Sequence, residues 1–277
     1  MTGPLLSRVV TCYHQWHFVE QWITLDGLFR ADTEWIIVND SPTDTPSDEL
    51  LRRIEARNIR IVSLKTNIGR SNARNAGANT ATGLWVDFVD GDDLPLVFDP
   101  AFLLSCSADL VSHPTRITVI GKGRFMDGAS APLNYPNDWA ELLHRFAPVG
   151  VAPSASLWQR SFFLGLGGFD GRFDGAEDTQ LVFRAMQAGG QIGRSDIPKQ
   201  CYFSKEIKHT YEPQHIYGHR RLFEYILRET DDVASKKSAH FWLGKECVFE
   251  FLLGWRLVWK NRSAIWQYTK SRLRIFG

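Results

Sequence analysis

The sequence has few cysteines and no long hydrophobic segment. Four cysteines are scattered over 277 residues, and no C-x-x-C pair occurs among them. This spacing argues against a zinc site or a disulfide-stabilised fold and is typical of reduced thiols. No stretch approaches the roughly 18 uninterrupted apolar residues that a membrane-spanning helix needs. The N-terminus also lacks the apolar core of a signal peptide, so we expect a cytoplasmic protein.

An excess of charge of one sign is missing as well. Lysine and arginine total 32 residues against 31 aspartates and glutamates, which argues against a nucleic-acid partner. Two phosphate-binding motifs are also absent, the G-x-x-x-x-G-K-[ST] loop of ATPases and the G-x-G-x-x-G turn of dehydrogenases. A bound nucleotide would therefore be held by side chains rather than by a glycine loop.

The first hundred residues alternate between predicted strands and predicted helices. Runs rich in β-branched residues, each expected to form a strand, cover residues 7–13, 34–40, 59–64 and 83–90. Apolar residues at helical spacing predict helices within residues 16–30 and 41–58, and a run of small residues predicts a helix over 69–82. This alternation predicts an α/β fold with a Rossmann-like, mostly parallel central sheet flanked by helices. Beyond this region we expect a helix over residues 100–111 and a strand over 116–123.

Three carboxylates crowd together at the end of the fourth predicted strand. Asp90, Asp92 and Asp93 stand within four positions. Like charges at such short range are unfavourable unless a cation lies among them. Magnesium and manganese prefer oxygen ligands and often take one or two carboxylates, with phosphate and water completing the shell. The alternative is that Asp92 or Asp93 only caps the turn before Pro95.

Polar residues also follow two other predicted strands. Thr11 and Tyr13 come after the first strand, and Asp40 comes after the second. Ligands of open α/β sheets bind beyond the carboxyl ends of the strands, so these residues and the acidic loop should meet in one site. Tyr13 suits packing against a nucleoside, and Asp40 suits a hydrogen bond to its base or ribose.

Five segments resemble, in order and spacing, the family 2 glycosyltransferases with the GT-A fold. They are "VVTCYHQ", "EWIIVNDSPTD", "NIGRSNARNAG", "GLWVDFVDGDD" and "LGGFDGRFDGAEDTQLVFRAMQAG", which together cover roughly residues 7–190. Each segment alone is a weak signal, whereas five in register are specific. The resemblance implies an inverting, metal-dependent transfer from a nucleotide-sugar. A UDP-sugar is the expected donor, and a GDP- or dTDP-sugar is the alternative.

On the donor side, the resemblance implies that four residues hold the nucleotide-sugar: Thr11, Tyr13, Asp40 and Arg74. Asp90 and Asp92 match the DxD motif, with Asp90 toward the nucleotide-sugar and Asp92 as a ligand of Mn²⁺ or Mg²⁺. His209 falls where many relatives place a further metal ligand, although a solvated loop residue is the alternative. Two positions depart from the family pattern, because Asn39 replaces an acid and His14 replaces an asparagine.

On the acceptor side, Asp178 matches the general base of the family. Glu177 is expected to orient the acceptor, and Trp158 offers an apolar platform for the face of a sugar. Each has a structural alternative. Glu177 and Asp178 would also complement the dipole at the start of a helix, and Trp158 would also suit the core.

We expect a GT-A domain over residues 1–235, with a nucleotide-binding half (1–100) and an acceptor-binding half (101–235). A C-terminal helical appendage should cover residues 236–277. Its segment 251–277 contains six lysines and arginines, no acid and several aromatic residues, which is typical of a helix on an anionic membrane surface. Packing on the domain or a homodimer contact are the alternatives.

Contact with the cytoplasmic face of a membrane would suit a lipid-linked acceptor, and the expected function is the synthesis of a surface polysaccharide or glycolipid. Two other classes of protein fit parts of the pattern. A non-catalytic module that binds a nucleotide-sugar or a glycan would not need Asp92 and Asp178. A glycosidase would use paired carboxylates but neither a metal cluster nor a nucleoside pocket.

Overall fold

The computed structural model describes residues 3–113, 116–121, 124–126, 156–197, 200–204 and 213–244. Contacts group the chain into two compact units, Met1–Ile207 and Lys208–Gly277. The predicted boundary after residue 235 and the division into a nucleotide-binding and an acceptor-binding half stay predictions. The basic, aromatic segment 251–277 lies outside the described residues.

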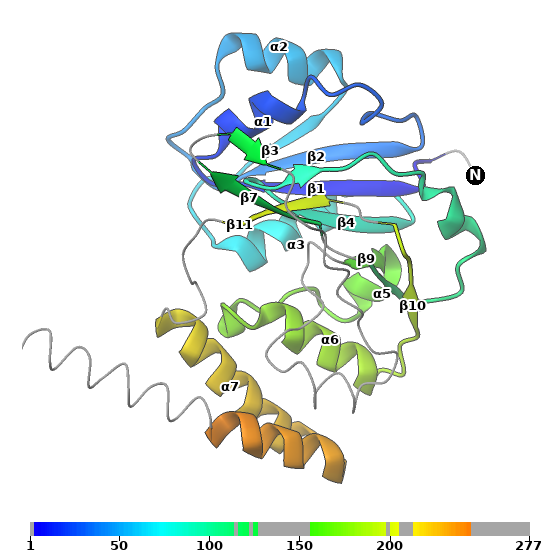
Figure 1. Cartoon of the computed structure of the whole chain (residues 1–277), viewed down its shortest axis with the longest axis vertical. Coiled ribbons are helices and arrows are strands. Elements are labelled where there is room, and N and C mark those ends of the chain that lie inside the picture. The colour runs from blue at the N-terminus through cyan, green and yellow to red at the C-terminus, as the bar shows by residue number, and fades with distance from the viewer. Residues whose placement is uncertain are drawn as a thin grey trace, which may run out of the picture. The chain divides into compact units, whose positions relative to one another are not determined.

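A seven-stranded sheet forms the centre of the first unit (Figure 1), with the strand order β10-β6-β9-β4-β1-β2-β3. The strands are β1 (Leu6–Cys12), β2 (Thr33–Asn39), β3 (Arg60–Ser63), β4 (Trp85–Asp90), β6 (Leu110–Ser112), β9 (Ser156–Gln159) and β10 (Ile192–Arg194). Strand β1 pairs in parallel with β2 and β4, and β2 pairs in parallel with β3. Only β9 runs antiparallel to its neighbours, β4 and β6. The predicted mostly parallel sheet is confirmed.

A second sheet of four strands was not predicted. Its order is β5 (Leu94–Pro95), β11 (Gln200–Ser204), β7 (Arg116–Gly121) and β8 (Arg124–Met126). The helix expected over residues 100–111 is also wrong. A short 3-10 helix, η1 (Pro100–Ser105), occupies its first part, and the chain becomes extended at Cys106. Residues 110–112 then form β6, where their backbone groups pair with β9 and β10.

Helices cover both faces of the large sheet (Figure 1). One face carries α1 (Trp16–Trp22) and α2 (Asp48–Ala56), and the other carries α3 (Arg70–Thr80), α5 (Arg160–Gly165) and α6 (Glu177–Gln187). Successive residues of a strand point to opposite faces, so Val9 belongs to the cluster with Ala73 of α3 while Val10 belongs to the cluster with Trp22 of α1. Both faces of the central strands are therefore buried, which explains their almost continuous apolar sequence.

Helix α3 packs closely against the sheet through small residues. Ala73, Gly77 and Ala78 are all buried. A Cβ atom on Gly77 would overlap the side chain of Val9 and would lie 3.0 Å from Val38. Only glycine permits this approach at position 77. The close packing brings the first turns of α3 to the carboxyl ends of the central strands.

The second unit contains α7 (Pro213–Glu229) and a helical segment over residues 233–244. Its buried apolar side chains are Leu222, Phe223, Ile226 and Ala239. Across the parts of the chain that the structure describes, no helix combines the length and the apolar character needed to cross a membrane.

Candidate active site

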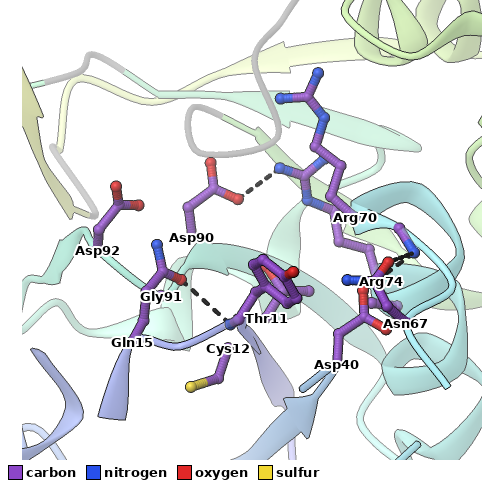
Figure 2. Close-up of a pocket in the computed structure, with 13 residues that line it drawn as sticks. Thr11, Cys12, Gln15, Asp40, Asn67, Arg70, Arg74, Asp90, Gly91 and Asp92 are labelled. Carbon is purple, nitrogen blue, oxygen red and sulfur yellow. Dashed lines mark hydrogen bonds and ion pairs between the residues drawn. The ribbon is translucent and has the colours of Figure 1, made fainter. Parts of the chain in front are cut away.

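A pocket of about 280 Å³ opens beyond the carboxyl ends of β1, β2 and β4 (Figure 2). The end of β1, the acidic loop after β4, and the start of α3 with its preceding loop form most of the lining. The lining residues are Thr11, Cys12, Tyr13, Gln15, Asp40, Asn67, Gly69, Arg70, Ala73, Arg74, Asp90, Gly91 and Asp92. Seven residues were predicted to contact the nucleotide-sugar or its metal. Six of them lie in this pocket, and the seventh is His209. Their contacts with a ligand stay predictions.

The three crowded carboxylates of the acidic loop face different surroundings. A tight turn forms because the Asp93 backbone N–H donates to the Asp90 carbonyl at 2.9 Å. Asp93 is buried, Asp92 is half-buried at the pocket, and Asp90 accepts a 2.5 Å hydrogen bond from Arg74. Gly91 is required at the centre of the turn, since a Cβ atom there would lie 2.5 Å from the Thr11 carbonyl oxygen. The fold thus relieves part of the repulsion that the sequence suggests.

Arg74 connects the acidic loop to the start of α6. Its Nη2 donates to Asp90 Oδ1 at 2.5 Å, and its Nη1 donates to Glu177 Oε1 at 3.1 Å. The Arg74 side chain is only 3% exposed. Burial acts to lower the pKa of Arg74, but the charges of Asp90 and then Glu177 outweigh burial and raise it above its ordinary value. This guanidinium group is a permanently charged bridge between two carboxylates.

Arg70 lies one turn before Arg74 on the same face of α3 and was not among the site residues predicted from the sequence. Its Nε donates to Asp174 Oδ1 at 2.9 Å and lies 3.0 Å from Glu177 Oε1. Burial acts to lower the pKa of Arg70, while the charge of Glu177 in particular raises it, and the net shift is upward. The signal in the sequence was the four-residue spacing from Arg74, which places both side chains on one helix face.

Asp40 shapes the loop that leads into α3. Its two carboxylate oxygens accept the backbone N–H groups of Ile68 at 2.8 Å and Gly69 at 3.1 Å. The neighbouring Asn39 donates to the Asp44 carbonyl at 2.9 Å and accepts from the Ser41 N–H at 3.0 Å. An amide can do both, whereas an ionised acid can only accept. This explains the asparagine at a position where the family pattern has an acid.

The glycine-rich loop before α6 is anchored on helix α3. The side-chain amide of Asn75 donates to the Phe169 carbonyl and accepts from the Phe169 N–H, both at 2.8 Å. The Arg74 guanidinium lies 5.4 Å from the centre of the Phe169 ring, in cation-π geometry. Helix α3 therefore carries the donor-side pocket at its start and holds the loop of the predicted base along its side.

Two residues predicted to contact the acceptor, Glu177 and Trp158, are buried. Glu177 is buried, and its Oε1 accepts from Arg74 while its Oε2 accepts from the Gly175 N–H at 2.8 Å. It positions the loop and cannot present a free carboxylate to an acceptor. Trp158 is 1% exposed in the core, with its Nε1 donating to Ser156 Oγ at 3.0 Å. Trp158 therefore lies in the core, which was the alternative interpretation of this residue.

Asp178 is half-buried in the first turn of α6. Its Oδ1 accepts from the Thr179 N–H at 2.6 Å, and it stands directly beside the buried Glu177. Its position in the first turn and its hydrogen bond from a backbone N–H are typical of an acid at a helix start. The role of Asp178 as a general base stays a prediction. His209, the second predicted metal ligand, lies outside the described residues.

The acidic loop fits a hard divalent cation. Within the described ranges, no three histidine, cysteine, aspartate or glutamate side chains gather into a complete metal site. Asp90 and Asp92 nevertheless offer carboxylate oxygens from one loop, and their side chains point the same way in Figure 2. One or two carboxylates are enough when a diphosphate and water complete the shell of Mn²⁺ or Mg²⁺. The oxygen donors at the pocket match that chemistry.

The part of the chain that builds this pocket matches a family model. Residues 7–120 match the model of "Glycosyl transferase family 2". This stretch is therefore similar to glycosyltransferase family 2, and the predicted resemblance is confirmed. The matched region includes β1, β2, α3 and the acidic loop.

Two relatives illustrate the similarity in sequence. The chain is 42% identical over 94 residues to the uncharacterized glycosyltransferase EpsJ of Bacillus subtilis (strain 168), covering 32% of this chain and 26% of EpsJ. It is 26% identical over 181 residues to the O-antigen biosynthesis protein RfbC of Myxococcus xanthus, covering 64% of this chain and 14% of RfbC. The chain thus spans about a quarter of EpsJ and a smaller share of RfbC.

Two solved structures share the fold. S. aureus TarS 1-349 in complex with UDP-GlcNAc superposes with a TM-score of 0.61 at 18% identity, over 89% of this chain and 72% of that one. The mannosyltransferase PcManGT from Pyrobaculum calidifontis, in complex with GDP-Man and Mn²⁺, gives 0.58 at 15% identity, over 99% and 81%. At these identities the likeness concerns the fold, and it confirms the predicted GT-A architecture.

Proposed function

We propose that this protein is an inverting glycosyltransferase that moves a sugar from a UDP-sugar to a glycan or lipid-linked acceptor. The observation that carries the proposal is the pocket beyond β1, β2 and β4. There, Tyr13 and Asp40 suit a nucleoside, while Asp90 and Asp92 suit a metal-bound diphosphate. The residues lie within the region that matches the family model.

In the proposed reaction, an acceptor hydroxyl oxygen forms a bond to the anomeric carbon while the bond from that carbon to the diphosphate oxygen breaks. Attack from the face opposite the leaving group inverts the configuration. Asp178 takes the proton of the attacking hydroxyl, a step typically worth about 10²- to 10⁴-fold in rate. Asp92, with Asp90 beside it, would hold Mn²⁺ or Mg²⁺, which offsets the negative charge on the leaving diphosphate.

Arg74 and Glu177 position the acidic loop and Asp178 relative to each other. Arg74 holds Asp90 at the pocket, and Glu177 ties the start of α6, where Asp178 lies, to the same arginine. The correct distance between an acidic metal loop and a base matters, because misplacement of about 1 Å can cost roughly 10²-fold in rate. A buried ion-pair network is suited to keep that distance constant.

The choice of a UDP-sugar is supported by the likeness to TarS, which has been solved with UDP-GlcNAc. A GDP-sugar is the second candidate, because PcManGT, solved with GDP-Man and Mn²⁺, matches nearly the whole chain. A dTDP-sugar is the third candidate donor. These donors differ in the base, which would lie near Tyr13, so a direct comparison of donors decides between them.

The decisive experiment measures the release of nucleoside diphosphate from a panel of UDP-, GDP- and dTDP-sugars, with Mn²⁺, with Mg²⁺ and with a chelator. We expect metal-dependent release from one class of donor. Asp92→Asn and Asp178→Asn should each lower the rate by at least about 10²-fold. Asp48→Asn is the matched control, because Asp48 is also an acid in the first turn of a helix but lies on α2. It should retain the wild-type rate.

Other outcomes would favour the rival classes. A nucleotide-sugar-binding module would bind a donor without releasing diphosphate, and Asp178→Asn would change nothing. A glycosidase would hydrolyse glycosides without regard to nucleotide or metal. Either result would overturn the proposed transfer.

The proposed acceptor is a growing surface polysaccharide or glycolipid, in keeping with the similarity to RfbC. If the acceptor is lipid-linked, the enzyme would work at the cytoplasmic face of a membrane, held by residues 251–277. Flotation of the full chain with liposomes should then require anionic lipid and should weaken at high salt. Sedimentation of the free protein tests the alternative, a homodimer formed through the same segment.

A further inference from the structure

Two cationic side chains line the pocket in the part of the chain that the structure describes, Arg70 and Arg74. They differ in what remains available for a ligand. Arg74 is 3% exposed and uses Nη1 on Glu177 and Nη2 on Asp90. The Arg70 side chain is 41% exposed. In Figure 2 both arginines extend from α3 on the side where Asp90 lies.

The diphosphate of a donor adds negative charge to a pocket that already holds an excess of it. Five carboxylates, those of Asp40, Asp90, Asp92, Asp174 and Glu177, stand around it against the two guanidinium groups. A divalent ion at the acidic loop would offset most of this excess, so the diphosphate needs a cation that faces it directly. Arg70 is the partly exposed cation that already feels the charge of Asp90, whose influence contributes to its raised pKa.

Arg70 has two carboxylate partners, the buried Glu177 and the exposed Asp174, and only the pair with Asp174 would have to be exchanged for a phosphate. Asp174 is largely exposed, and an ion pair at that exposure contributes little to stability because water solvates both charges. A guanidinium group can instead form two parallel hydrogen bonds to a phosphate, which are stronger than bonds between neutral groups. Releasing Asp174 therefore costs little compared with the bonds to a diphosphate.

Building on the proposed function, we propose that Arg70 is a donor-binding residue that exchanges its ion pair with Asp174 for the diphosphate of the nucleotide-sugar. Arg74 keeps its structural pairs throughout. The alternative is that Arg70 only joins α3 to the loop before α6. The two roles make opposite statements about Asp174, because a joining role needs that carboxylate and a phosphate-binding role competes with it.

The test is calorimetry on the full chain with Mn²⁺, using UDP, GDP and dTDP and the matching monophosphates as ligands. Arg70→Met should weaken binding of the preferred diphosphate about tenfold or more and should reduce its advantage over the monophosphate. Arg70→Lys should recover part of the affinity, since it keeps the charge without the two-pronged geometry. Asp174→Asn should leave the affinity unchanged or increase it. Arg53→Met, which removes an arginine of similar exposure from α2, serves as the control.

The inference is overturned if Arg70→Met binds the diphosphate within about twofold of the wild type, or if Asp174→Asn weakens binding as much as Arg70→Met does. Equal losses for the monophosphate and the diphosphate would also contradict it, because they would indicate a general disturbance of the pocket. If the wild-type protein binds none of the three diphosphates while Mn²⁺ is present, the proposed function fails and this inference fails with it. Arg70→Lys and Asp174→Asn keep the test valid should Arg70→Met fold poorly.

Discussion

Asp90 and Glu177 share the guanidinium group of Arg74, although one ends β4 and the other begins α6. The bridge joins the predicted metal loop to the predicted catalytic loop through a side chain that is almost completely buried. A displacement of either loop would break one of the two ion pairs of Arg74. The relative position of the two loops is thus built into the core of the first unit.

Replacing Arg74 with methionine should strongly destabilise the protein. The substitution leaves Glu177 with one ion-pair partner fewer at a buried site, and losing one partner of a buried pair typically costs about 3–5 kcal/mol. Urea unfolding measures this as a lower midpoint. Arg53→Met removes an exposed pair with Glu49 and should cost less than about 1 kcal/mol. Similar losses for both variants would show that the Arg74 bridge contributes no more than a surface pair.

Gly91→Ala should impair the acidic loop. The added methyl group would lie 2.5 Å from the Thr11 carbonyl oxygen and would also meet the Gln15 side chain, so the loop must shift. We expect weaker Mn²⁺-dependent diphosphate binding, by about tenfold or more. Adding Gln15→Ala should not restore it, because the backbone of Thr11 remains in place. Gly165→Ala, where nothing lies within 4 Å of the new methyl group, should bind normally.

Gly77→Ala should lower stability even though alanine favours helices more than glycine. The helix preference is worth about 1 kcal/mol, whereas overpacking against Val9 typically costs about 1–3 kcal/mol. The double variant Gly77→Ala with Val9→Ala removes the overlap. Its loss in the free energy of unfolding should be smaller than the sum of the single losses by about 1 kcal/mol. Simple additivity would mean that α3 and β1 can separate without cost.

Cys12 should make stability fall in alkaline solution. Burial raises the pKa of its thiol from 9.0 to about 11, so the folded protein keeps a proton in this window that the unfolded chain has lost. The native state then binds more protons, and the free energy of unfolding decreases as the pH rises through the window. The decrease amounts to about 2–3 kcal/mol, and the contribution is intact below pH 9.

Urea titrations between pH 8.5 and 11.5 check this prediction for Cys12. Cys12→Ala should lose about 2–3 kcal/mol less over this range than the wild type does. Identical slopes for wild type and Cys12→Ala would show that the thiol does not retain its proton.

Much of the site could be predicted from the positions of its residues along the chain. Tyr13, Asp40 and Asp90 each lie at or just after the end of a parallel strand, and such ends meet at one edge of the sheet whatever the details of packing. Trp158 and Glu177 show the limit of this reasoning. An aromatic residue near a loop and an acid at a helix start suit either a ligand or the interior, and only their neighbours decide.

The sequence by itself determined the order of strands and helices over the first hundred residues, the resemblance to family 2 glycosyltransferases and the set of residues at the strand ends, because these depend on periodicity and on local spacing. The tertiary structure alone decided that Arg70 and Arg74 join α3 to the loop before α6, that Trp158 is buried, and that a second sheet forms. The physical reason is that burial and ion pairing depend on groups distant along the chain, which local patterns do not record.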